Sequence, residues 1–316
     1  MGIDMPIEQL QNYQGQNPKP ADWEKYWERA LHELDQTDPQ PELIKSDFQV
    51  PNAECFDLYF NGVKSCRIHA KLIKPSNIEK KAPAMLMFHG YSDSAGEWNQ
   101  KLNYTSIGFV VAAMDVRGQG GLSEDLNPVR GTTLNGHIVR GIDDPDPDNL
   151  FFRQVFLDTA QLARVLMSFD FVDENRLAVK GGSQGGALTL ACAALVPQIK
   201  KIAVWYPFLS DFKRSYEMGH APAEIPTYFR KCNPDHSREE EVFQKLGYID
   251  VQFLAPKIKA EVLFFTGLTD VTCPPSTQAA VYNKLTCKKK QLFYPDFGHE
   301  DLTGSNDIAM QFFLDL

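Results

Sequence analysis

Several features that would place this chain in a special class of protein are missing from its sequence. It contains no run of about 20 apolar residues, the length needed to cross a bilayer. The N-terminus lacks the basic and apolar regions of a secretory signal, so we expect a cytoplasmic protein. Lys and Arg number 32 against 41 Asp and Glu, a net charge of −9. That acidic balance argues against nucleic acid or an anionic membrane as a partner.

Regular cysteine spacing and repetition are absent too. The six cysteines are scattered and none forms a C-x-x-C pair, so we expect neither a zinc site nor a disulfide framework. No internal repeat and no low-complexity tract interrupts the 316 residues. Hydrophobic residues make up 43% of the chain and charged residues 23%, an ordinary globular balance with enough material for a large core.

The pattern along the chain indicates an α/β fold. From residue 83 onward, short unbroken apolar runs each stop at Gly, Pro or Asp, which is typical of strands buried on both faces of a parallel sheet. The runs are PAMLMFHG, IGFVVAAMDVRG, NRLAVKGG, IKKIAVWYP, AEVLFFTG and KQLFYPDFG. Helical patterns at 156–172 and 184–196 lie between them. We therefore expect a doubly wound, mostly parallel sheet with its chemistry at the carboxyl ends of the strands.

The N-terminal part and two polar segments depart from this alternation. Apolar residues at three- and four-residue spacing predict a helix over 20–36. The runs ECFDLYFNG and VKSCRIHAKLIKP predict an antiparallel hairpin with a turn at Asn61-Gly62. Residues 121–150 form a long polar stretch, and residues 207–250 read as a small helical insertion. We interpret 1–316 as a single domain, with a helical extension over about 1–45 and the insertion over about 207–250.

The stretch AVKGGSQGGALTL, residues 178–190, carries the clearest chemical signal. Its core fits G-x-S-x-G, follows a strand-like run and leads into a helix-forming run, the context in which this motif presents a nucleophilic serine. Glycines on either side give strand and helix room to pass close to each other. The alternative is a glycine-rich turn whose Ser183 caps the next helix.

Ser183 needs a general base, which in hydrolases with such a turn comes after the serine. Three histidines follow it. His220 and His236 lie in the polar insertion, where we expect them to face solvent. His299 follows the last strand-like run and is the preferred base.

Two carboxylates compete to orient His299. Asp270 ends the buried run AEVLFFTGLT, from which it can reach the imidazole from behind. Asp296 is only three residues from His299 and has little reach, and Glu300 and Asp301 are weaker candidates on the same loop. Asp270 is preferred, with a purely turn-forming role as its alternative.

An acyl-transfer site also needs N–H donors for the oxyanion. One should be the main-chain N–H of Gln184, directly after the nucleophile. The loop after MLMF should supply the second, and we select the N–H of Tyr91. His89 in this loop is interpreted as structural rather than catalytic. Arg117, at another strand end, either binds a substrate anion or forms an internal ion pair, with Asp115 or another carboxylate; we favour the ion pair.

Taken together, these segments resemble the acetyl xylan esterase and cephalosporin C deacetylase family, carbohydrate esterase family seven. The residues that carry the resemblance are Arg117-Gly118-Gln119, Gly181-Gly182-Ser183-Gln184-Gly185 and His299-Glu300, supported by HGY near 90 and GLTDVTCPPSTQAAVYN near 270. The resemblance implies an α/β-hydrolase fold, no metal and no cofactor. Arg117, Gly118, Gln119, Gly181 and Gly185 are then structural residues near the site.

The resemblance further implies removal of acetyl groups from small substrates, such as acetylated xylo-oligosaccharides and cephalosporin C. It implies a homohexamer in which the N-terminal helix and the long polar segment make subunit contacts. The alternatives are a peptidase or a broad short-chain esterase of the same fold, and a catalytically inactive hydrolase fold that serves as a binding protein.

Overall fold

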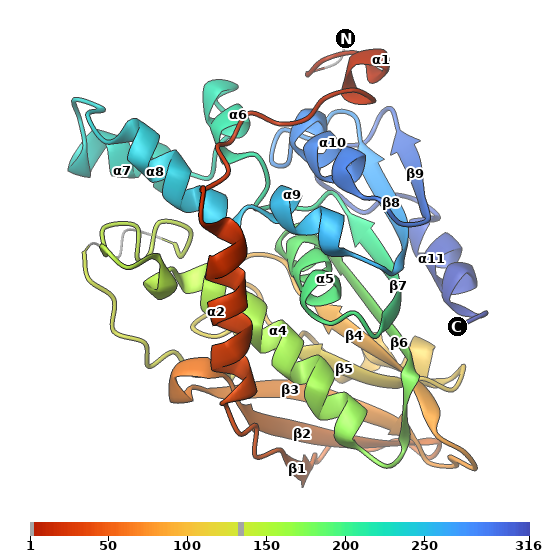
Figure 1. The fold of residues 1–316 in the computed structure, drawn as a ribbon. Coiled ribbons are helices and arrows are strands. Elements are labelled where there is room, and N and C mark those ends of the chain that lie inside the picture. Colours follow the sequence, from red (N-terminus) through yellow and green to blue (C-terminus); the bar gives the residue numbers. More distant parts are fainter. Residues whose placement is uncertain (1–2, 132–135) are drawn as a thin grey trace.

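The computed structural model describes residues 3–131 and 136–316. In these residues nine strands form one sheet in the order β1-β2-β3-β5-β4-β6-β7-β8-β9 (Figure 1). The strands are β1 (Glu42–Lys45), β2 (Ala53–Asn61), β3 (Arg67–Pro75), β4 (Ala82–Phe88), β5 (Val110–Met114), β6 (Val172–Gly182), β7 (Ile199–Trp205), β8 (Glu261–Gly267) and β9 (Lys289–Tyr294). From β1 to β5 neighbours run antiparallel, and from β5 to β9 they run parallel. The predicted α/β-hydrolase type of sheet is confirmed.

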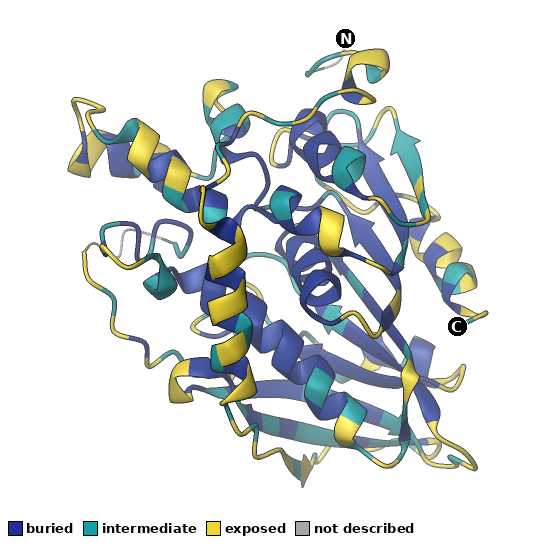
Figure 2. Ribbon diagram, viewed as in Figure 1, coloured by how far each residue is buried: buried dark blue, intermediate teal, exposed yellow. Residues whose placement is uncertain are grey.

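Helices cover both faces of the sheet. They are α1 (Ile7–Leu10), α2 (Trp23–Asp35), α3 (Leu102–Thr105), α4 (Phe151–Ser168), α5 (Gln184–Leu195), α6 (Phe212–Glu217), α7 (Glu224–Cys232), α8 (Glu239–Leu246), α9 (Val251–Leu254), α10 (Pro275–Lys284) and α11 (Ser305–Phe313). The larger core lies under α2, α4 and α5, and a smaller one lies under α3 and α11 on the other face. Figure 2 shows α5 and the central strands as the most continuously buried elements. No helix in the described ranges has the length and apolarity to span a membrane.

The predicted hairpin is present, but its turn is not the expected one. β2 and β3 pair antiparallel from Ala53 opposite Pro75 to Asn61 opposite Arg67. A short 3-10 turn over Val63–Ser65 connects them, with Lys64 in the left-handed region at φ 58°. Gly62 itself has φ −81°, so the Asn-Gly pair does not form a type I′ turn, which needs positive φ at both central residues.

Other boundaries differ more. α4 begins at Phe151, before the expected residue 156, and ends at Ser168, because Val172 already starts β6. β1, at the sheet edge, was not expected within the N-terminal segment. Between β7 and β8 the chain forms α6, α7 and α8, which lie in the stretch interpreted as a helical insertion. Part of the 121–150 stretch, residues 132–135, lies outside the described residues.

The order of the parallel strands determines which loops meet. β4, β6, β7, β8 and β9 lie side by side, so their carboxyl ends share one edge of the sheet. The loops that leave β4, β6, β8 and β9 carry Tyr91, Ser183, Asp270 and His299, respectively. Residues that are far apart in sequence are thereby collected at one place, as expected for open α/β sheets.

Candidate active site

Ser183 stands in a strained turn between β6 and α5. Its backbone has φ 58° and ψ −123°, a conformation that residues with a side chain rarely adopt. Main-chain hydrogen bonds hold the turn: Ser183 N donates to Trp205 O at 3.0 Å, and Ser183 O accepts from Phe208 N at 3.0 Å and from Ala187 N at 3.1 Å. The hydroxyl makes no capping bond to α5, so the capping alternative does not describe this serine.

The glycines around Ser183 are required by space. A Cβ on Gly185 would collide with the carbonyl oxygen of Phe88 at the end of β4. A Cβ on Gly181 would collide with the carbonyl oxygen of Gly185. Backbone atoms cannot move aside as a flexible side chain can. The strand, the turn and the helix can therefore approach this closely only without side chains at these two positions.

Three side chains form a hydrogen-bonded chain at this turn. His299 Nε2 lies 3.0 Å from Ser183 Oγ, and His299 Nδ1 lies 2.9 Å from Asp270 Oδ2. Asp270 is fully buried, while the side chain of His299 is 24% exposed. A carboxylate only accepts, so Nδ1 carries the proton and Nε2 is left to accept from the serine hydroxyl. The other oxygen of Asp270 accepts from Thr272 N and Cys273 N, both at 2.8 Å, which fixes the carboxylate.

The competing residues lie elsewhere. His236 is exposed and pairs with Glu239 in the same segment, and His220 also lies there. Asp296 is exposed on the loop after β9. Glu300 accepts from Gly298 N at 3.0 Å instead of approaching His299. Of the acids considered, the structure brings Asp270 to the imidazole.

The two expected oxyanion donors make no hydrogen bond to the described residues of the protein. In the described part of the chain, the main-chain N–H groups of Tyr91 and Gln184 have no hydrogen-bond partner. Gln184 is the first residue of α5, where N–H groups lack intrahelical acceptors. Free donors at a helix start beside a serine are suited to receive a developing negative charge.

A pair of side-chain amides ties the loop after β4 to the serine turn. Gln119 Nε2 donates to Gln184 Oε1 at 2.7 Å, and Gln184 Nε2 donates to Gln119 Oε1 at 3.1 Å and to Gly90 O at 3.2 Å. Gln119 Oε1 also accepts from Ser92 N at 3.0 Å. Gly118 precedes this pair with φ 64°, a conformation for which glycine is suited. The R-G-Q segment thus holds the loop that bears Tyr91.

The side chain of Tyr91 is anchored by residues that the sequence did not single out. Its hydroxyl donates to a carboxylate oxygen of Glu224 on α7 and accepts from His137 N at 2.5 Å. Glu224 is buried, and Gly136 leaves the space that it occupies. The polar segments 121–150 and 207–250 therefore both contact the loop of the expected oxyanion donor. No periodic pattern in those segments could have identified these residues.

Arg117 forms an internal ion pair and is not available to a substrate. Its Nε and Nη2 each donate to a carboxylate oxygen of Asp158 on α4 at 2.6 Å, and both residues are fully buried. The partner is Asp158 and not Asp115, whose carboxylate is bound by His69. His89 is also structural: Nδ1 donates to Gly90 O at 2.7 Å and Nε2 accepts from Val116 N at 3.0 Å. Burial lowers its pKa, which favours this neutral form.

Two further side chains lie against the triad. The ring of Tyr206 is 4.6 Å from that of His299 between centroids. Cys273 is buried, and burial raises the pKa of its thiol well above the usual value. Donor atoms of Asp270, Cys273 and His299 lie within 4.8 Å of one another. Both nitrogens of His299 already bond to Asp270 and Ser183, so we interpret this group as part of the triad and not as a set of metal ligands.

Comparison with known proteins agrees with this geometry. The family model described as acetyl xylan esterase (AXE1) matches residues 1–316. The chain belongs to the acetyl xylan esterase family. Acetyl xylan esterase 1 from Thermoanaerobacterium sp. JW/SL YS485 is 56% identical, with 99% of each chain covered and a TM-score of 0.97. The acetyl xylan esterase from Paenibacillus sp. R4 is 34% identical, with 98% of this chain and 99% of that chain covered and a TM-score of 0.93.

A curated relative is longer than this chain. Acetyl esterase Axe7A from Xylanibacter ruminicola is 28% identical over 299 residues, which is 92% of this chain and 66% of the relative. The chain thus spans just under two thirds of that protein's length. Family membership and the two structural likenesses support a carboxylic ester hydrolase that removes acetyl groups.

Proposed function

We propose that the protein is a serine esterase that removes acetyl groups from small substrates through an acetyl-enzyme. The observation that carries the proposal is the chain from Asp270 through His299 to Ser183, at 2.9 and 3.0 Å. The family and its acetyl xylan esterases support the choice of the acetyl group.

The geometry suggests the order of events. Ser183 Oγ attacks the acetyl carbonyl carbon while His299 Nε2 takes the hydroxyl proton. Asp270 orients the imidazole and stabilises its charged form. The N–H groups of Tyr91 and Gln184 bind the oxyanion. His299 then returns the proton to the leaving alcohol, and a water activated by the same base releases acetate and restores Ser183.

For substrates we propose acetylated xylo-oligosaccharides and related acetylated sugars, together with cephalosporin C. We expect a narrow preference for short acyl groups and wide tolerance of the alcohol. Crowding around the triad supports the acyl limit, because Cys273 lies beside Asp270 and His299 and the ring of Tyr206 lies against His299.

A rate profile tests the function directly. We expect p-nitrophenyl esters to be hydrolysed rapidly as acetates, with a steep fall beyond propionyl and little activity at octanoyl. Acetylated xylo-oligosaccharides should be turned over and peptide amides should not. Ser183→Ala should lower kcat at least about 10⁴-fold with the melting temperature retained. Cleavage of peptide amides, or an even rate up to octanoyl, would favour a peptidase or a broad short-chain esterase instead.

The assembly and location remain predictions. We propose a homohexamer in the cytoplasm, with the N-terminal helix and the segment 121–150 in subunit contacts. Light scattering of the purified protein measures the mass in solution. A monomeric mass would rule out the hexamer without affecting the esterase proposal.

A further inference from the structure

The loop that follows β7, residues 206–211, contacts two members of the triad. Phe208 N donates to Ser183 O at 3.0 Å, so the loop holds the main chain of the nucleophile. The ring of Tyr206 lies against that of His299, with 4.6 Å between the centroids. The position of this loop therefore bears on how closely Ser183 Oγ and His299 Nε2 approach each other.

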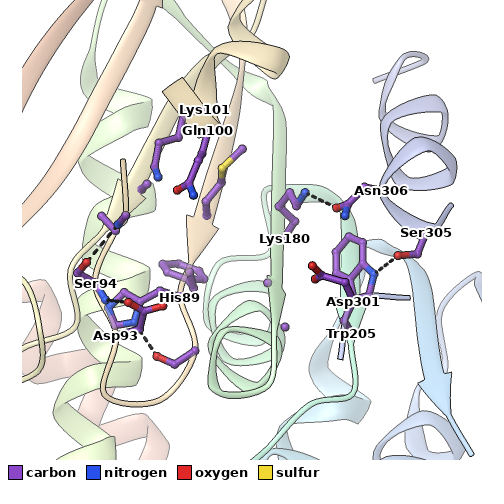
Figure 3. Close-up of a pocket in the computed structure, with 18 of the residues that line it drawn as sticks. His89, Asp93, Ser94, Gln100, Lys101, Lys180, Trp205, Asp301, Ser305 and Asn306 are labelled. Carbon is purple, nitrogen blue, oxygen red and sulfur yellow. Dashed lines mark hydrogen bonds between the residues drawn. The ribbon is translucent and has the colours of Figure 1, made fainter. Parts of the chain in front are cut away.

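This loop is also strained. Tyr206, Leu209 and Asp211 have φ angles of 30°, 54° and 46°, in a region that residues with a side chain rarely adopt. Such residues persist where the surrounding structure fixes them. The sheet fixes the start of the loop, because Trp205 ends β7 and its indole Nε1 donates to Ser305 Oγ at 2.9 Å (Figure 3). The other end of the loop is Asp211.

The carboxylate of Asp211 is held by the N-terminal part of the chain. Asp211 is fully buried and stands at the N-cap of α6, yet its side chain makes no capping bond. Within the described residues it accepts instead from Tyr13 Oη, Gln16 N and Asn17 N, each at 2.8 Å. A buried carboxylate is costly without such charge-assisted hydrogen bonds. Residues 13–17, which we call the strap, therefore supply the donors that this carboxylate needs.

The strap is itself fixed to several helices. Asn283 Nδ2 of α10 donates to Tyr13 O at 2.7 Å and to Leu10 O, just before the strap, at 2.8 Å. Asn17 Nδ2 donates to a main-chain oxygen of α8 at 3.2 Å, and Asn17 Oδ1 accepts from a main-chain N–H of α6 at 3.2 Å. Figure 1 shows this N-terminal segment passing α6 before it enters α2. The strap thus offers Asp211 donors that are already in place.

We propose that the strap positions the active site: its three donors hold Asp211, and Asp211 holds the strained loop against Ser183 and His299. Asp211 is a positioning residue, because it acts through the loop and not on a substrate. The inference rests on the proposed function, since it assigns the strap a role in the same site. A misplacement of about 1 Å can cost about 10²-fold in rate. Loss of the strap contacts should therefore lower kcat and leave KM nearly unchanged.

Two substitutions of Asp211 test the proposal in the full-length protein. Asp211→Asn keeps an oxygen for Gln16 N and Asn17 N and gains an N–H₂ that can donate to Tyr13 Oη, and Asn tolerates the left-handed backbone. Asp211→Gly also tolerates this backbone but loses all three hydrogen bonds. We expect Asp211→Asn to keep kcat within about threefold and Asp211→Gly to lose at least about tenfold, with KM within about twofold in both.

The measurements are kcat and KM for p-nitrophenyl acetate and the rate constant at which a fluorophosphonate labels Ser183. The labelling rate should follow kcat. We express kcat per site labelled to completion, so that unfolded molecules are not counted. Tyr13→Phe removes one donor of three and should lower both rates about two- to threefold. The control Asn12→Ala, at an exposed side chain that donates to Glu8 O, should change neither.

The other outcomes overturn the proposal. Parent-like rates per labelled site in Asp211→Gly would make the strap an element of stability alone. A rise in KM at constant kcat would assign the loop to substrate binding. Equal losses in Asp211→Asn and Asp211→Gly would show that the charge matters and the hydrogen bonds do not. Labelling needs no acetyl substrate, so a parent protein that is labelled but does not hydrolyse acetyl esters would contradict the proposed function and leave this test intact.

Discussion

Two histidine–carboxylate clusters in this molecule contain the same residue types but differ in role: one suits catalysis and the other is structural. At the triad, His299 meets one carboxylate and one hydroxyl and is 24% exposed. In the hairpin region, His69 of β3 is 1% exposed and lies between two carboxylates, with Nδ1 2.6 Å from Asp115 and Nε2 2.9 Å from Asp57. His69 has no nitrogen left to accept a proton from a substrate. In both histidines Nδ1 faces a carboxylate, so the difference lies at Nε2. A histidine can act as a base when Nε2 faces a hydroxyl and solvent can reach the ring. It is structural when Nε2 faces a second carboxylate and the ring is buried, and we call His69 with Asp57 and Asp115 the structural clamp.

The largest difference in kcat between the two clusters should appear when one carboxylate in each is replaced by an amide. We expect Asp270→Asn to lower kcat about 10⁴-fold, because the amide N–H₂ would face Nδ1 and favour the wrong imidazole tautomer. The loop should keep its shape, since the remaining amide oxygen can still accept from Thr272 N and Cys273 N. The matched change Asp57→Asn should leave kcat within about twofold. Steady-state kinetics on p-nitrophenyl acetate measures both values of kcat. Equal losses of kcat in the two variants would contradict the distinction between a catalytic and a structural cluster.

The free energy of unfolding, in contrast to kcat, should depend strongly on the cluster around His69. His69→Leu leaves Asp57 and Asp115 without their common partner, and we expect the free energy of unfolding to fall by about 3–5 kcal/mol. Urea denaturation measures this. The control His236→Leu, at an exposed histidine, should stay within about 0.5 kcal/mol of the parent. A loss below about 1 kcal/mol for His69→Leu would show that the cluster is not a clamp.

The clamp should also give the protein a particular response to acid. Burial alone would raise the pKa of Asp115, but hydrogen bonds from His69, Leu122 N and Ala95 N outweigh it and lower that pKa from 3.8 to about 2. A depressed carboxyl pKa contributes stability above the unfolded value, about 2 kcal/mol here, which is lost as pH falls from about 4 to about 2. Urea denaturation from pH 5 down to pH 3 should reveal about half of this loss, and the slope of the unfolding free energy against pH should flatten in Asp115→Asn. An unchanged slope would contradict the assignment.

The same contrast explains what the sequence could predict. The apolar strands of the sheet are followed by Ser183, Asp270 and His299, and the parallel order of those strands brings their ends together. The apolar pattern and the order of residues along the chain were therefore enough to select these three. Asp158 was missed as the partner of Arg117 because it lies in a helix whose pattern does not say which polar residue faces inward. Glu224 was missed because it begins the short helix α7 within the polar insertion, and the position of that helix depends on tertiary contacts rather than on periodicity.

The smallest expected effect concerns the loop that carries the proposed oxyanion donor. Tyr91→Phe removes the hydroxyl that joins Glu224 and His137 N but keeps the main-chain N–H of residue 91 in the chain. Losing one oxyanion donor entirely costs about 10²–10³ in rate, so a loosened donor should lower kcat by about three- to tenfold. KM should change little, because the oxyanion exists only after the attack on the carbonyl.

Tyr59→Phe is the control, since the Tyr59 hydroxyl has no hydrogen bond within the described ranges, although its ring lies against His69. A rise in KM at constant kcat would instead assign Tyr91 to substrate binding, and parent-like kinetics would show that the loop is held by the Gln119–Gln184 amide pair without help from Glu224.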